Sequence, residues 1–113
     1  MKLPYAKRAI VPMRKLTEYL LSETHGKGKH KARLFAKIGY DKDNVLELKE
    51  CLLRIGHTEK VKQIKKTLYG KNYLIEGKMT APIGQLVTIK TVWFIRFGTK
   101  HPRLITAYPF MVQ

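Results

Sequence analysis

The hydrophobic pattern of this chain changes its period at His57, and that change limits the folds open to it. Before His57, apolar residues recur at helical spacing, whereas the later runs are rich in β-branched and aromatic residues and are separated by glycine and proline. We expect helices over 13–22 and 29–39, and a third from Asn44 to Gly56. Strands are predicted over 59–68, 72–80, 85–97 and 102–110. This order predicts an α+β fold, with N-terminal helices packed on one side of a four-stranded antiparallel β-sheet.

The third helix carries recognisable signals at both ends. Asn44 and Glu47 stand at the spacing of a capping box, in which each side chain bonds the backbone of the other. Gly56 follows the apolar stripe and is placed where a helix commonly stops.

Charge is the unusual property of the composition. The 113 residues include 23 Lys and Arg against 8 Asp and Glu, a net charge of +15. A single domain over residues 1–113 is expected from this length, and its field would attract polyanions at long range. A lysine-rich surface also serves solubility, so the charge alone does not identify a site.

Several functional classes find no support in the sequence. Cys51 is the single cysteine, and the four histidines show no ligand spacing on one element, so we expect no metal and no cofactor. The apolar run after Lys7 and Arg8 is too short for a signal peptide, and no stretch is long enough to cross a membrane. We therefore expect a protein with no membrane association that acts in the cytoplasm.

The second predicted helix begins in a cationic, glycine-rich loop that contains His25. A loop-to-helix junction directs backbone N–H groups outward and suits a phosphate, although an ordinary solvated turn has the same composition. Helical geometry places Lys29, Arg33 and Lys37 on the face opposite the apolar residues. Lys31 falls on the apolar side, where its ammonium group either reaches past the helix end or is directed at the sheet.

His30 lies at the border of these two faces and could reach the same cleft as Lys31, although a single histidine is more often a surface residue. On the last strand, alternation predicts that Thr106 and Tyr108 share a face with Leu104, opposite Arg103 and Ala107. The two hydroxyls could orient a phosphate, or the two residues could simply belong to the packed sheet.

RNA cleavage is the chemistry that this inventory permits without a metal. The 2′-hydroxyl of RNA can attack the adjacent phosphate if a base removes its proton, an acid protonates the departing 5′ oxygen, and cations stabilise the phosphorane. Histidine, lysine, arginine, threonine and tyrosine are sufficient for these roles. DNA lacks the internal nucleophile, so such an enzyme would favour RNA.

Three segments carry a family resemblance: Lys15 to Leu21, Gly28 to Phe35, and Pro102 to Pro109. They are similar to a family of small bacterial domains of unknown function, and they resemble the ribonuclease toxins that share the barnase, EndoU, colicin and RelE fold (BECR). The resemblance implies helices on a four-stranded sheet and a metal-independent endoribonuclease, often the toxin of a toxin–antitoxin or contact-dependent inhibition system.

The resemblance also implies roles for individual residues. It matches His30 and Lys31 to a helix-borne basic pair and Thr106 and Tyr108 to a hydroxyl pair, which together form the expected catalytic set. Six further basic residues are expected to contact RNA or its phosphates: His25, Lys29, Arg33, Arg96, His101 and Arg103. The second histidine of EndoU-like sites has no match at the same spacing, and His25 and His101 are the candidates for it.

The expected partners are RNA (tRNA, mRNA or rRNA) and an acidic antitoxin or immunity protein. One alternative is a non-catalytic RNA-binding or ribosome-binding basic protein, whose affinity would fall steeply with salt. Another is a structural component of a phage or secretion apparatus, whose basic surface meets an acidic neighbour.

Overall fold

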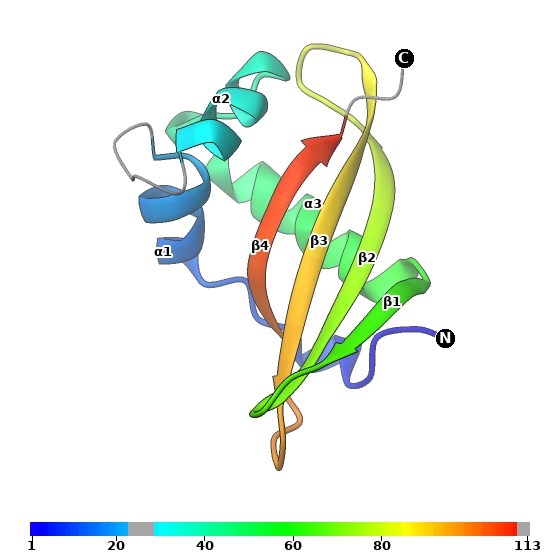
Figure 1. The fold of residues 1–113 in the computed structure, drawn as a ribbon. Helices are drawn as coiled ribbons and strands as arrows, with labels where there is room; N and C mark the ends of the chain where they lie inside the picture. The colour runs from blue at the N-terminus through cyan, green and yellow to red at the C-terminus, as the bar shows by residue number, and fades with distance from the viewer. Residues whose placement is uncertain (23–28, 111–113) are drawn as a thin grey trace.

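Four consecutive strands form the sheet of the computed structural model. The structure describes residues 1–22 and 29–110, apart from the side chains of Tyr19, Lys29 and His30. The strands are β1 (Val61–Lys66), β2 (Gly70–Thr80), β3 (Leu86–Arg96) and β4 (Arg103–Phe110). They pair in the order β1-β2-β3-β4, each antiparallel to its neighbour (Figure 1). The predicted four-stranded meander is therefore confirmed.

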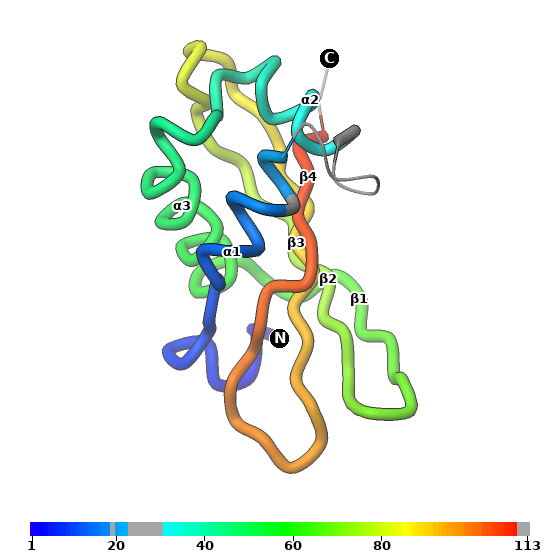
Figure 2. The backbone as a smooth tube through the Cα atoms, turned by 90° about the vertical axis from the view of Figure 1, so that its left-hand side faces the viewer, coloured from blue at the N-terminus to red at the C-terminus, as the bar shows by residue number. Residues whose placement is uncertain are grey.

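The helices lie on one face of this sheet, as Figures 1 and 2 show. Alternate residues of each long strand are buried beneath them, as strand geometry requires. The largest of these buried side chains is that of Trp93, which is 0% exposed. The predicted α+β class, with helices packed on one side of the sheet, is confirmed. No helix among the described residues is long and apolar enough to cross a membrane.

The longest helix, α3 (Val45–Thr58), corrects two predictions about its ends. Gly56 does not stop the helix but lies inside it and is buried against the sheet, where a Cβ would come within 2.7 Å of the Trp93 ring. Asn44 does not cap α3 through its side chain. Its side chain instead accepts a hydrogen bond from Asp41 N at 2.9 Å and donates one to Gly39 O at 2.8 Å, which fixes the turn before α3.

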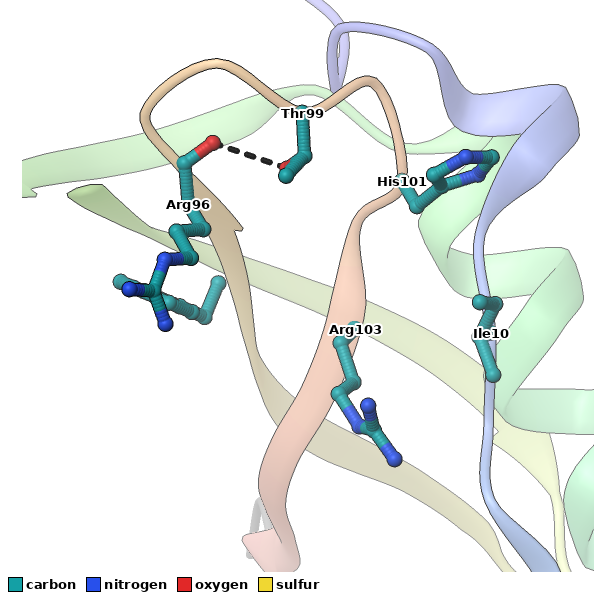
Figure 3. A pocket seen from close by; sticks show the side chains of 6 residues that line it. Ile10, Arg96, Thr99, His101 and Arg103 are labelled. Carbon is teal, nitrogen blue, oxygen red and sulfur yellow. Dashed lines mark hydrogen bonds between the residues drawn. The ribbon is translucent and has the colours of Figure 1, made fainter. Parts of the chain in front are cut away.

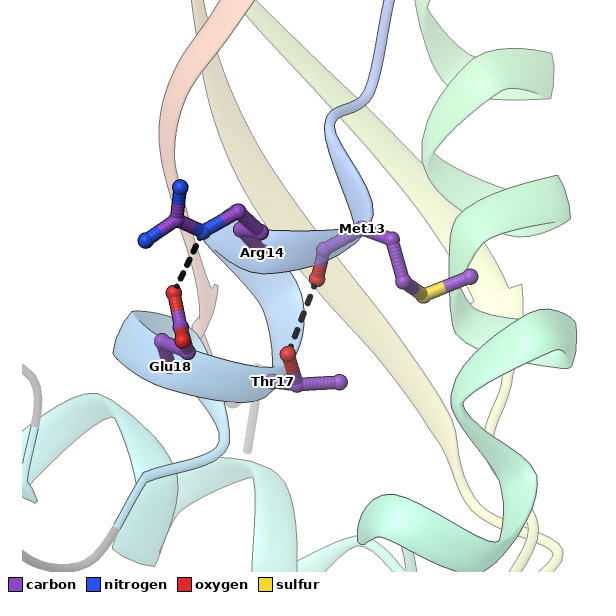
Figure 4. A network of polar contacts seen from close by, with 4 residues as sticks. All are labelled: Met13, Arg14, Thr17 and Glu18. Atoms are coloured by element: carbon purple, nitrogen blue, oxygen red, sulfur yellow. Dashed lines mark hydrogen bonds and ion pairs between the residues drawn. The ribbon is translucent and has the colours of Figure 1, made fainter.

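The first helical segment is shorter than predicted and partly irregular. A single turn, α1 (Met13–Lys15), continues into a π-helical turn, η2 (Leu16–Leu20), whose Leu16 and Leu20 are fully buried. Figure 4 shows two contacts within this segment: on its exposed side Arg14 Nε donates to Glu18 at 2.8 Å, and on its part-buried side the Thr17 hydroxyl donates to Met13 O at 3.2 Å.

The second helix, α2 (Lys29–Lys37), also ends earlier than residue 39. Gly39 has a φ of +99°, the left-handed conformation that commonly terminates helices. The N–H of Tyr40 then bonds Phe35 O at 2.9 Å. The predicted apolar face is correct, since Ala32, Phe35 and Ile38 are all buried.

The N-terminal arm connects the two outer strands of the sheet. Its first residues pair at the start of β1, where Lys2 faces Lys60 and Val61 N donates to Met1 O at 2.7 Å. After a 3₁₀ turn, η1 (Ala6–Arg8), Ile10 pairs beside Arg103 at the start of β4. The arm is therefore held at both edges and contributes Ile10 to the surface described next.

Candidate functional site

The sheet face turned away from the helices carries most of the predicted strand residues, and we call it the open face. Strand register arranges it in rows that run across the sheet. The first row, next to the β3–β4 hairpin, consists of Lys65, Asn72, Phe94 and Arg103. The second consists of Gln63, Leu74, Val92 and Thr106. The third consists of Glu76, Lys90 and Tyr108. Cationic, aromatic and hydroxyl side chains thus share one surface, which none of the described helices covers.

A cavity of about 370 Å³ lies at the hairpin end of this face, and we call it the hairpin pocket. It is lined by Ile10, Phe94, Arg96, Thr99, His101 and Arg103. Three of these, Arg96, His101 and Arg103, are residues that the sequence predicted to contact RNA. In Figure 3, the Arg103 guanidinium lies between Arg96 on one side and His101 with Ile10 on the other. The structure therefore brings two cations and an imidazole around one cavity.

Two features hold the hairpin pocket in shape. The Thr99 hydroxyl donates to Arg96 O at 2.8 Å, and Thr99 N donates to the same carbonyl at 3.0 Å, which closes the turn after β3 (Figure 3). On the other side, Ile10 N donates to Pro102 O at 2.8 Å and Leu104 N donates to Ile10 O at 3.0 Å. The arm and the turn therefore fix the backbone on either side of His101.

A β-bulge in β4 corrects the predicted alternation of that strand. Val92 pairs with Thr106, but the next residue, Trp93, pairs with Leu104, so Ile105 is an extra residue. Leu104 consequently faces the core and is 1% exposed, whereas Arg103 joins Thr106 on the open face. The prediction that placed Leu104 with Thr106, and Arg103 opposite them, was wrong because it assumed an unbroken strand.

Thr106 and Tyr108 do share a face, as predicted. The Thr106 Oγ1 is buried and has no hydrogen-bond partner among the described residues. Tyr108 lies beside Lys90, whose Nζ is 5.9 Å from the Tyr108 ring centroid and 4.5 Å from that of Phe110. Lys90 Nζ also lies 3.8 Å from Glu76, so part of its charge is already balanced.

The predicted helix-borne groups lie at the other end of β4. The helix α2 contacts β4 and sits beside its C-terminal end (Figure 2). Lys31 is half-buried on this helix, and Arg33 is exposed. Lys29 and His30 belong to α2, but their side chains are not described, and His25 lies outside the described residues. The roles of all five residues stay predictions.

The predicted residues of the hairpin pocket and those of α2 are thus separated along β4. Arg103 and Tyr108 are five residues apart, which corresponds to roughly 16 Å along a strand. The sequence did not indicate Ile10 or Thr99 as parts of the site. For Ile10 the reason is that no pattern within one segment shows that the arm reaches the start of β4. It also left Asn72 unremarked, although the register places Asn72 in the same row as Phe94 and Arg103.

Comparison with solved structures shows where this fold has been seen before. The chain is similar to a chain in a contact-dependent growth inhibition toxin–immunity protein complex from Klebsiella pneumoniae 342, with a TM-score of 0.69 and 16% identity. The match covers 89% of this chain and 99% of the other. No curated protein matches. A family match extends over residues 2–111, and the chain belongs to that family, a domain of unknown function, DUF6883.

Proposed function

We propose that this protein is a toxin domain that cleaves RNA without a metal ion, with the RNA lying on the open face. The observation that carries the proposal is the hairpin pocket, where Arg96, His101 and Arg103 line one cavity beside an aromatic ring. The fold likeness to a chain of a toxin–immunity protein complex supports the toxin role. The net charge of +15 supports a polyanionic substrate.

The pocket contains the groups that transesterification needs. Arginine guanidinium groups bind phosphate through paired N–H donors, so Arg96 and Arg103 would hold the scissile phosphate and stabilise the phosphorane. Histidine exchanges protons readily near neutral pH. His101 would take the proton from the 2′-hydroxyl or give one to the departing 5′ oxygen. The products are a 2′,3′-cyclic phosphate and a 5′-hydroxyl end.

Other cavities on the same face suit a phosphate less well. A cavity of about 360 Å³ near the far end of the sheet is lined by the carboxylates of Glu59 and Glu76 together with two lysines, Lys62 and Lys78. The opposite charges there offset one another, so this cavity attracts a phosphate less than a cavity lined by cations alone. The hairpin pocket is lined by two arginines and no carboxylate.

The residues implied by the family resemblance belong to the same proposal. Because α2 sits beside the end of β4, His30 and Lys31 could supply the second proton-transfer group or a further phosphate contact. Thr106 and Tyr108 lie on β4 between the hairpin pocket and α2. RNA on the open face would then extend from Arg103 toward Tyr108. An acidic immunity protein that covers this face would block the enzyme.

Cleavage of total RNA in the presence of a chelator tests the proposal. We expect His101→Ala and Arg103→Ala each to reduce cleavage about 100-fold or more, the scale of a lost acid–base or electrostatic contribution. His57→Ala is the matched control, because His57 is an exposed histidine on α3, in the helical layer. Cleavage by His101→Ala and Arg103→Ala at the rate of His57→Ala would refute the assignment. Assaying His30→Ala and Lys31→Ala in parallel measures the contribution of α2.

The open face also supports a second candidate function, RNA binding without cleavage. Phe94, Tyr108 and Phe110 share this face with Lys65 and Lys90, and aromatic side chains among cations are a common platform for single-stranded nucleic acid. Expression in a host without a partner protein separates the two functions. The ribonuclease toxin arrests growth and leaves cyclic phosphate ends, whereas the binding protein does neither.

A further inference from the structure

A further cavity, of about 300 Å³, lies on the open face beside the hairpin pocket. Its lining residues come from the three strands β1, β2 and β3: Gln63, Lys65, Asn72, Leu74 and Val92. We call it the amide pocket. Its composition differs from that of the hairpin pocket, because it combines two carboxamides and one lysine with two apolar side chains.

One atom in the amide pocket has no structural role in the described residues. The Asn72 Oδ1 is shielded from solvent and finds no hydrogen-bond donor there. A buried acceptor without a donor is unfavourable, and an apolar side chain would fit the same place without that cost. A half-turn of the amide about χ2 is a soft motion that exchanges the places of Oδ1 and Nδ2, so Oδ1 can leave this buried position.

The chemistry of the lining selects a class of ligand. Leu74 and Val92 provide an apolar floor from adjacent strands, which suits the face of a flat ring. Gln63 and Asn72 offer amide donors and acceptors, and Lys65 offers a charged donor at the rim. A phosphate would meet a single cation together with an unpaired acceptor. A flat ring edged with both N–H and carbonyl groups matches all five residues.

We propose that the amide pocket holds an unpaired nucleobase that donates an N–H group to Asn72, and that it gives the protein a base preference in RNA. The inference rests on the proposed function, because it assigns to the same open face the part of RNA that identifies sequence.

The position of the pocket links it to the phosphate site. Asn72 pairs with Phe94, and Phe94 pairs with Arg103, so the two pockets share one row of the sheet. The Cα atoms of Asn72 and Arg103 are therefore separated by two strand spacings, about 10 Å. A short RNA segment can place a phosphate beside Arg103 and a neighbouring base over Leu74. Phe94 stands between them and offers a ring for stacking.

Binding of short oligonucleotides that cannot be cleaved tests this assignment. The probes are fluorescently labelled 2′-O-methyl oligomers of A, C or U and an abasic oligomer of the same length, titrated by anisotropy. We expect one of the three base-bearing oligomers to bind about tenfold more tightly than the other two and than the abasic one, the scale of a good side-chain–base contact. Equal affinity for the three base-bearing probes would overturn the proposal.

Variants then locate the base preference in the pocket. Asn72→Leu and Lys65→Met should each reduce the preference to about threefold or less, since each removes one base contact. The control Lys71→Met removes the same charge from an exposed lysine outside the pocket and should keep the preference. Asn72→Leu should also melt at or above the wild-type temperature, because it removes an unpaired acceptor. A lower melting temperature, or an unchanged preference in Asn72→Leu, would contradict the assignment.

The same measurements separate this inference from the proposed function. Discrimination among the probes without cleavage of total RNA would support the amide pocket and refute the nuclease. Cleavage of total RNA with equal binding of all probes would refute the pocket and leave the nuclease standing. Absence of binding to every probe would overturn the pocket assignment.

Discussion

The indole Nε1 of Trp93 donates a hydrogen bond of 2.8 Å to the Thr91 Oγ1, and both side chains are fully buried. The Thr91 hydroxyl in turn donates to Ile75 O at 2.8 Å. A single hydroxyl therefore satisfies one donor and one acceptor beneath the helices.

Replacing this hydroxyl tests how much the buried chain contributes. We expect Thr91→Val to lower the free energy of unfolding by about 1–3 kcal/mol, because the Trp93 N–H and the Ile75 carbonyl lose their shared partner. Urea unfolding followed by tryptophan fluorescence measures it directly, since Trp93 is the only tryptophan. Thr80→Val, at an exposed position of β2, is the control and should leave the midpoint nearly unchanged. Equal midpoints for the two variants would refute the prediction.

Close packing of α3 on the sheet gives a second prediction. A Cβ at Gly56 would lie 2.7 Å from the Trp93 Cζ2, inside van der Waals contact. Gly56→Ala gains about 1 kcal/mol of helix propensity but overpacks the core, which typically costs about 1–3 kcal/mol. We expect net destabilisation, measured as a lower melting temperature than that of wild type. His57→Ala, at the exposed neighbouring position, should melt close to wild type. A rise in the melting temperature of Gly56→Ala would show that Trp93 moves without cost.

Gly56 also shows why the helix ends could not be read from the sequence. A glycine after an apolar stripe looks like a stop signal, but here the missing side chain allows α3 to approach Trp93, more than thirty residues away in the chain. The change of period at His57 was a local property, and it predicted the α+β class correctly. Close approach between distant segments is not a local property.

Tyr40, in the turn that follows α2, predicts a pH dependence. Tyr40 is 4% exposed, and burial, together with the neighbouring Cys51, raises the pKa of its hydroxyl above the ordinary value. Above about pH 10 the unfolded chain loses this proton while the folded chain keeps it, so stability falls as pH rises. Between about pH 8 and about pH 11, Tyr40→Phe should lose less stability than wild type in thermal melts. Tyr69→Phe, at an exposed tyrosine, should follow wild type. Parallel curves for Tyr40→Phe and wild type would contradict the pKa shift.

The candidate site was predictable in its residue types and not in its assembly. Arg96, His101 and Arg103 were identified from the sequence, but alternation alone placed Arg103 on the wrong side of β4. The extra residue Ile105 reverses which residues of β4 face the core on either side of it. This bulge is recognised from the register between β3 and β4, and not from a pattern within β4 itself. The place of Asn72 beside the hairpin pocket follows only from the pairing of β2 with β3.

The phosphate contact assigned to Arg103 predicts a change in salt dependence. Each cation that neutralises a phosphate of a single strand contributes about 0.7 to the slope of log K against log salt concentration. Arg103→Met should therefore flatten this slope by about 0.7 for a 2′-O-methyl oligonucleotide, whatever its bases. Arg54→Met removes the same charge from an exposed position of α3, in the helical layer, and should keep the wild-type slope. A loss of affinity in Arg103→Met with no change in slope would mean that Arg103 does not contact a phosphate. Equal flattening in both variants would mean that the RNA responds to total charge and not to the open face.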